Sequence, residues 1–137
     1  MKDKKFITVG ILGALAVALG ALGAHYLRGK MTEGLITADQ MEGFEKAVKY
    51  QMYHTIVMLI IIILQHSFSN KLLQWSFALF FCGIILFSGS LYFLCTRNLF
   101  GADWLKFLGP VTPIGGFCFI AGWLCLGFSG ITIKKSD

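Results

Sequence analysis

The chain has 137 residues, of which 56% are hydrophobic and 14% charged, and its mean hydropathy is +0.72. This composition is too apolar for an ordinary soluble domain and indicates an integral membrane protein. The charged residues, whose net charge is +5, lie at the termini and between the apolar stretches, with Lys49 at the edge of one stretch. This placement indicates that the basic residues set the membrane topology, and it predicts no nucleic-acid partner.

Four apolar stretches are long enough to cross a membrane, because a hydrocarbon core about 30 Å thick needs roughly 20 helical residues. They cover about 6–27, 48–66, 72–96 and 113–131, and Lys49 is the one Lys, Arg, Asp or Glu inside them. We therefore expect residues 1–137 to form a single integral membrane domain. Its expected fold is all-α, an antiparallel bundle of four transmembrane helices.

The N-terminal stretch and the charges bear on topology. The sequence MKDKK, an apolar run and ALGA are also typical of a signal peptide, but the length of the run favours a retained helix. Four spans place both termini on one side, and equal numbers of Lys and Arg fall on either side. Lysines close to the span ends, and acidic residues on the opposite side, favour cytoplasmic termini.

Small residues predict where the helices pack. On the first span one helical face carries Gly13, Ala16, Gly20 and Gly23. The opposite face carries Ala14, Ala18, Ala21 and His25. Because small residues let helices approach closely in lipid, we expect neighbours on both sides of this span. Gly115 and Gly116 predict a close contact near the start of the fourth span.

An amphipathic segment precedes the second span. Thr37 and Gln40 have the spacing of a capping box. Met41, Phe44 and Val48 then recur at helical spacing among charged residues. The pattern predicts a short interfacial helix that continues into the second span.

Polar residues gather where the first span ends, the second begins, the third ends and the fourth begins. Because antiparallel helices alternate in direction, these four places lie at one membrane face, opposite the termini. The residues expected in this layer are His25, Tyr50, Gln51, His54, Ser88, Ser90, Tyr92 and Thr112. They need partners, since an unsatisfied polar group in hydrocarbon costs several kcal/mol. Two interpretations stay open: a structural hydrogen-bond network, or a site for a small molecule, lipid, proton or metal.

Specific chemistries have less support. Two histidines on two helices would suit a haem or the start of a metal site. However, no carboxylate falls in the layer, and the four cysteines lack the spacing of a zinc site. No nucleophile, base and orienting group occur together in the pattern. We therefore expect no catalytic residue, no cofactor, no metal and no enzyme activity.

Four motifs occur in order along the chain: GALGAHYLRG, AVKYQMYH, LFSGSLY and TPIGGFCFIAGW. Together they resemble the family catalogued as domain of unknown function 423, the YwdK- and YgdD-like small membrane proteins, whose eukaryotic relatives include transmembrane protein 256. The resemblance covers roughly residues 10–123. It implies four transmembrane helices in a bacterial plasma membrane and implies no biochemical activity. The matching motif positions are His25, Tyr50, Gln51, His54, Ser88, Gly89, Ser90, Tyr92, Thr112, Pro113, Gly115, Gly116 and Trp123.

The sequence thus predicts a non-enzymatic membrane protein that acts as an interaction or accessory subunit. Its expected partners are the lipid bilayer and either another membrane protein or a second copy of the chain. The alternative is the binding of a lipid, a quinone or another small ligand in the polar layer.

Overall fold

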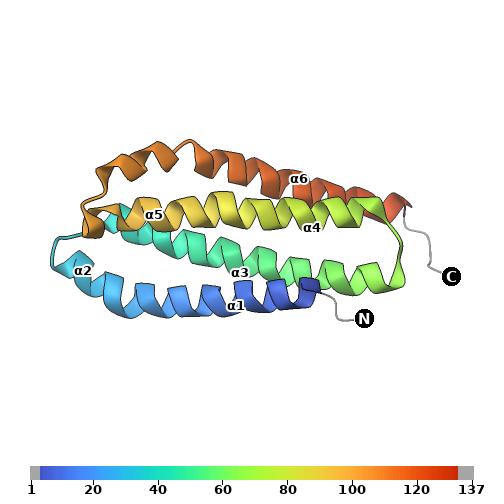
Figure 1. Cartoon of the computed structure of the whole chain (residues 1–137), viewed down its shortest axis with the longest axis horizontal. Helices are drawn as coiled ribbons and strands as arrows, with labels where there is room; N and C mark the ends of the chain where they lie inside the picture. Colours follow the sequence, from blue (N-terminus) through green and yellow to red (C-terminus); the bar gives the residue numbers. More distant parts are fainter. Residues whose placement is uncertain (1–3, 133–137) are drawn as a thin grey trace.

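The computed structural model of the protein describes residues 4–132. Four helical spans, Lys4–Thr32, Ala38–Ser67, Lys71–Phe100 and Asp103–Thr132, are long and apolar enough to cross a membrane. They run antiparallel in chain order (Figure 1). The predicted all-α, four-helix membrane fold is confirmed. The helical segments are α1 (Lys4–Leu22), η1 (Gly23–Leu27), α2 (Arg28–Thr32), α3 (Ala38–Ser67), α4 (Lys71–Gly83), η2 (Ile84–Gly89), α5 (Ser90–Thr96), η3 (Arg97–Phe100), η4 (Asp103–Leu108) and α6 (Val111–Thr132).

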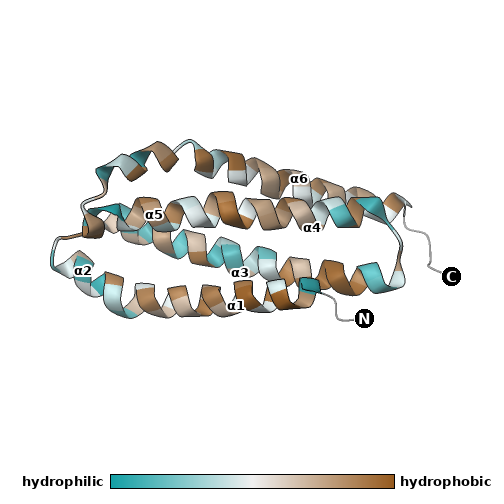
Figure 2. Ribbon diagram, in the orientation of Figure 1, coloured by the Kyte–Doolittle hydropathy of each residue, from teal (hydrophilic) through white to brown (hydrophobic). Residues whose placement is uncertain are grey.

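The two ends of the bundle differ. At one end α1 begins and α6 ends, and we call this the terminal end (Figure 1). The opposite end, which holds α2, η3 and η4, is the loop end. A helix of 30 residues is about 45 Å long, whereas the hydrocarbon core is about 30 Å thick. The helices therefore extend beyond the hydrocarbon core, and hydrophilic residues lie toward both ends of the bundle (Figure 2).

The helices pack as two hairpins. The most extensive contacts join α1 to α3 and α4 to α6, and α3 joins the hairpins by packing against α4, η2 and α5. The apolar core toward the terminal end combines residues of all four spans. Its buried members are Val9, Leu12, Met58, Ile61, Ile62, Leu73, Phe80, Ile84 and Phe119.

The predicted small-residue face of α1 packs against α3. A Cβ added to Gly20 would lie 3.4 Å from the side chain of Val48, and one added to Gly23 would lie 3.1 Å from the ring of Phe44. Ala16, between them, is 1% exposed. Small residues thus bring the two helices together, as expected in lipid.

The opposite face of α1 has no such neighbour among the described residues. Ala14, Ala18, Ala21 and His25 are all exposed there. Within the described residues, α3 is the helix that packs along α1. Packing on the second face of the first span stays a prediction.

The fourth span makes the closest backbone contact. A Cβ on Gly115 would lie 2.3 Å from the backbone nitrogen of Phe87 in η2, closer than real Cβ contacts occur. At Gly116 an added Cβ would meet only the Phe87 ring, at 4.0 Å. Of the two predicted glycines, Gly115 thus marks the contact where α6 crosses η2.

The segment before the second span is helical from its predicted start. Thr37 caps α3, and both hydrogen bonds of the predicted capping box with Gln40 are present. The helix then continues unbroken to Ser67. Met41 and Phe44 are buried in a second apolar cluster at the loop end. The apolar face of this amphipathic segment therefore contacts protein, and the segment lengthens the span.

Two spans contain one wider turn each. The helix is of the π type in η1 and again in η2. Such turns are rare and occur mostly as single bulges within α-helices. The η2 turn lines a groove between α1 and α5.

Candidate functional site

The structure divides the predicted polar layer into separate groups. Gln51 bonds to Tyr92, His54 bonds within an aromatic cluster, and Ser90 bonds to Thr112. His54 lies near the middle of the 30-residue α3 rather than at a helix end. The described hydrogen bonds thus form separate groups, and the expected single layer at one membrane face stays a prediction.

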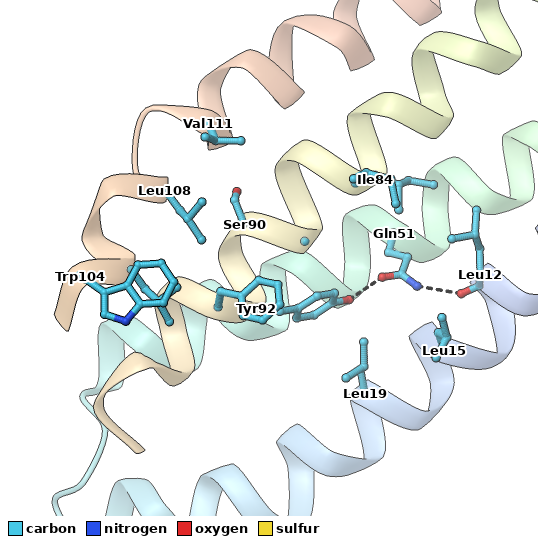
Figure 3. A pocket seen from close by; sticks show the side chains of 14 residues that line it. Leu12, Leu15, Leu19, Gln51, Ile84, Ser90, Tyr92, Trp104, Leu108 and Val111 are labelled. Carbon is cyan, nitrogen blue, oxygen red and sulfur yellow. Dashed lines mark hydrogen bonds between the residues drawn. The ribbon is translucent and has the colours of Figure 1, made fainter. Parts of the chain in front are cut away.

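A hydrogen-bonded bridge centred on Gln51 joins three helices. The Tyr92 hydroxyl of α5 donates to Gln51 Oε1 at 2.8 Å, and Gln51 Nε2 donates to the Leu12 carbonyl of α1 at 2.8 Å (Figure 3). Gln51 is 3% exposed. A primary amide carries two N–H donors and a phenol oxygen can also accept. One Gln51 N–H and the Tyr92 oxygen lone pairs therefore remain for a further partner.

A groove opens beside this bridge. Its cavity has a volume of about 590 Å³, and α1 forms one wall while η2 and α5 form the other. The η4 segment closes it toward the loop end through Trp104, Leu105 and Leu108. Figure 3 shows Gln51 and Tyr92 beside this space, with leucines of α1 facing them. The full lining is Leu12, Leu15, Leu19, Gln51, Ile84, Ile85, Gly89, Ser90, Tyr92, Phe93, Trp104, Leu105, Leu108 and Val111.

The groove faces the lipid side of the molecule. Leu15, Ile85 and Phe93 are each about half exposed, and Trp104 is exposed at the loop end. Apart from Gln51, Ser90 and Tyr92, the lining side chains are apolar or glycine, with the indole of Trp104 at one end. The chemistry offered is therefore an apolar slot with a few hydrogen-bonding groups, which is typical of small-molecule sites.

His54 belongs to a different environment. Its Nδ1 lies 2.7 Å from the Tyr50 carbonyl, and its Nε2 lies 3.3 Å from Trp123 Nε1. An indole N–H can only donate, so Nε2 accepts, and the proton of the neutral imidazole resides on Nδ1. The ring stacks on Phe119 with a centroid distance of 3.6 Å and an interplanar angle of 5°. Both ring nitrogens are thus engaged.

The hydroxyl groups tie helices to one another. Ser88 Oγ donates to the Ala47 carbonyl of α3 at 2.8 Å. Ser90 Oγ lies 2.6 Å from Thr112 Oγ1 and also donates to the Phe87 carbonyl. These bonds join η2 and α5 to α3 and to the start of α6, and each is worth only about 0.6 kcal/mol on average in membrane proteins.

His25 stands apart from the other predicted residues. Its side chain is exposed in η1, on the face of the first span that points away from α3. The residue of α1 that lies level with His54 is Gly13, which packs against the neighbouring Thr55. His25 lies twelve residues beyond Gly13 on the same span, which corresponds to roughly 18 Å along the helix axis. The two histidines are not placed to bind one haem or one metal ion.

Several residues around the groove and the His54 cluster lie outside the predicted set. The Leu12 carbonyl accepts the Gln51 bond, and Trp123 donates to His54. A backbone carbonyl carries no side-chain signal, so no pattern reveals it. The indole N–H of Trp123 in an apolar span requires an acceptor, and this requirement is the sequence signal for its contact.

The sequence of the chain is similar to those of known membrane proteins. Residues 19–116 match the family described as "Protein of unknown function (DUF423)". UPF0382 membrane proteins of Staphylococcus aureus and Staphylococcus epidermidis are each 44% identical over 124 residues, covering 90% of this chain and 92% of theirs. One of Staphylococcus haemolyticus is 42% identical with the same coverage. No solved structure matches the chain significantly.

Proposed function

This chain belongs to the DUF423 family of multi-pass membrane proteins, and we propose that it binds a mostly apolar, membrane-soluble molecule in the groove between α1 and α5. The proposal is the small-ligand interpretation of the polar residues, with the site centred on Gln51 and Tyr92 rather than on the two histidines.

The volume and lining of the groove are the main support for this proposal. The volume of about 590 Å³ lies within the range of roughly 300–1,000 Å³ found for small-molecule sites. Such sites combine apolar walls with a few placed polar groups. Here the leucines of α1 and the isoleucines of η2 form the walls, and Gln51 and Tyr92 supply the polar groups.

The remaining hydrogen-bonding capacity defines the ligand. One Gln51 N–H is available for an acceptor such as a carbonyl oxygen, and the Tyr92 oxygen is available for a donor such as a hydroxyl. The groove lining toward η4 is mainly apolar and suits a hydrocarbon chain. A quinone or a lipid that carries one carbonyl or hydroxyl group on a long chain fits both requirements.

The proposed role is binding without catalysis. The groove offers an amide, two hydroxyls and an indole, and none of these is paired with a base. His54 is the buried imidazole nearest in sequence to Gln51, and Tyr50 and Trp123 engage both of its nitrogens. General acid–base chemistry needs such a group within hydrogen-bond reach of the ligand.

A blocked groove tests the proposal. The full-length protein is extracted with its lipids in a polymer disc, and retained small molecules are identified by native mass spectrometry and solvent extraction. Leu15→Trp fills the groove from α1. Ile11→Trp is the matched control, because Ile11 is similarly exposed on α1 but does not line the groove.

The expected result is one recurrent molecule in the unmodified protein and in the Ile11 variant, and its loss from the Leu15 variant. Equal retention by the two variants, or no bound molecule in any preparation, refutes the proposal. Loss of the molecule from both variants refutes its placement in the groove.

A second candidate function is an accessory role with a helical partner. It is supported by the exposed small residues Ala18 and Ala21 on the outer face of α1, because such residues favour close helix contact. Stoichiometry in polymer discs tests it. Ala18→Phe is expected to dissolve a complex formed through this face, and a monomer with no recurrent protein partner refutes it.

A further inference from the structure

The polar part of the groove lies deep in the membrane, whereas its apolar roof lies at the loop end of the bundle. Gln51 lies thirteen residues after Ala38, the first residue of α3, which corresponds to about 20 Å along the helix. A 30-residue helix centred in the membrane extends about 8 Å beyond the hydrocarbon core on each side. Gln51 therefore lies roughly 12 Å inside the core, close to its midplane. Trp104 of η4 lies at the other end of the groove (Figure 3).

This order of polar and apolar groups is the reverse of that in a phospholipid. A phospholipid of the adjoining leaflet has its charged headgroup at the interface and its chains in the hydrocarbon core. The groove is closed at the interface by Trp104, Leu105 and Leu108. Its hydrogen-bonding pair, Gln51 and the Tyr92 hydroxyl, lies farther in. A phospholipid in its ordinary orientation would therefore set its headgroup against apolar side chains.

The groove also offers no counter-charge. Of the residues that the structure describes, none that lines the groove has a charged side chain. The charged residues of η4, Asp103 and Lys106, are exposed and pair with each other at 3.2 Å. A charged group inside the bilayer is costly unless a partner or water accompanies it. Depth and charge thus both exclude an ionic headgroup.

We infer that the groove selects an uncharged lipid whose carbonyl-bearing head lies near the middle of the bilayer, and the class that fits is a quinone with a hydrocarbon tail. This inference rests on the proposed function and narrows its ligand from a lipid or a quinone to the quinone. One ring carbonyl accepts the free N–H of Gln51. The tail leaves between α1 and α5, where Leu15 and Phe93 are each about half exposed.

Competition binding to the full-length protein tests the inference. Native mass spectrometry from mild detergent measures binding of three molecules, first separately and then in equal amounts. They are a naphthoquinone with an isoprenoid tail, diacylglycerol, and phosphatidylglycerol. Leu15→Trp blocks the groove, and Ile11→Trp is again the matched control because Ile11 is similarly exposed outside it.

The quinone is expected to bind at least about tenfold more tightly than phosphatidylglycerol, because the groove holds no partner for a charge. It should also bind more tightly than diacylglycerol, whose polar head belongs at the interface. Leu15→Trp should abolish quinone binding, and Ile11→Trp should leave it unchanged. If either glycerolipid competes with the quinone on equal terms, the groove is a general lipid site, so the inference fails while the proposed function stands. Binding of none of the three also overturns the inference, and the test of retained molecules then decides the proposed function separately.

The carbonyl stretch of the bound quinone reports its contact with Gln51. A hydrogen bond lowers the frequency of this stretch, so infrared difference spectra at saturating quinone should show one lowered band. Gln51→Leu should return the band to the frequency of the free quinone, and Gln51→Met serves if leucine prevents folding. Gln74→Leu is the control, since Gln74 is exposed on α4 and lies outside the groove. An unchanged band in the Gln51 variants overturns the placement of the head.

Discussion

Replacing Gln51 by leucine removes the centre of the bridge between α1, α3 and α5. The variant loses the bond from the Tyr92 hydroxyl and the bond to the Leu12 carbonyl. The carbonyl keeps its place in the helical ladder of α1, whereas the Tyr92 hydroxyl loses its acceptor. Leucine has nearly the size of glutamine, so cavity formation contributes little.

The magnitude follows from measured hydrogen bonds in membrane proteins, which average about 0.6 kcal/mol and reach about 1.7 kcal/mol. Two bonds give an expected loss of roughly 1–2 kcal/mol in the free energy of unfolding. Tyr92→Phe removes only one of them, so it should cost about 0.6 kcal/mol. If the two residues bond as described, their effects are coupled by about the same amount.

The assay is reversible unfolding of the full-length protein in bicelles, with both single variants and the double variant. A double-mutant cycle isolates the interaction between Gln51 and Tyr92. A coupling energy within about 0.3 kcal/mol of zero would refute the bridge, because additivity at that level is typical of independent sites.

Four other substitutions test the packing, the His54 cluster and the cap of α3. Gly115→Ala should destabilise the protein by about 1–3 kcal/mol, because its Cβ would meet the η2 backbone, whereas Gly116→Ala should be nearly neutral in the same unfolding assay. Trp123→Phe should shift the ¹⁵N resonance of His54 Nε2, since it removes the hydrogen bond to that nitrogen; an unchanged resonance contradicts this hydrogen bond. Thr37→Ala should cost about 1 kcal/mol and speed hydrogen exchange in the first turn of α3, and equal exchange rates would show that the cap contributes nothing.

The fold was predictable because hydropathy and helix capping depend on residues that are close together in the sequence. The apolar stretches gave the four spans, and Thr37 with Gln40 gave the start of α3. The packing face of α1 followed from small residues at helical spacing. These features depend on neighbours within one or two helical turns, so a single sequence contains them.

The candidate site was only partly predictable, because a residue in a helix has both a depth and a direction. Alternating helix direction predicts depth alone, and it placed His25 together with His54. The direction of His25 follows instead from its face, which is shared with Ala18 and Ala21 and points outward. The groove results from the separation of α1 from α5, which no pattern of residue types reveals. The bond from Gln51 to a backbone carbonyl likewise has no signal in the sequence.

The pairing of α1 with α3 and of α4 with α6 has a consequence for biosynthesis. Each pair consists of consecutive spans, so a newly made span finds its main neighbour in the span just before or just after it. The first pair can close through the small residues of α1 before α4 leaves the ribosome. The Ser88 and Trp123 bonds to α3 form only once the second pair has been inserted. The groove is therefore completed last, when η4 has been placed over its end, and a chain arrested before that point would lack the site while still spanning the membrane.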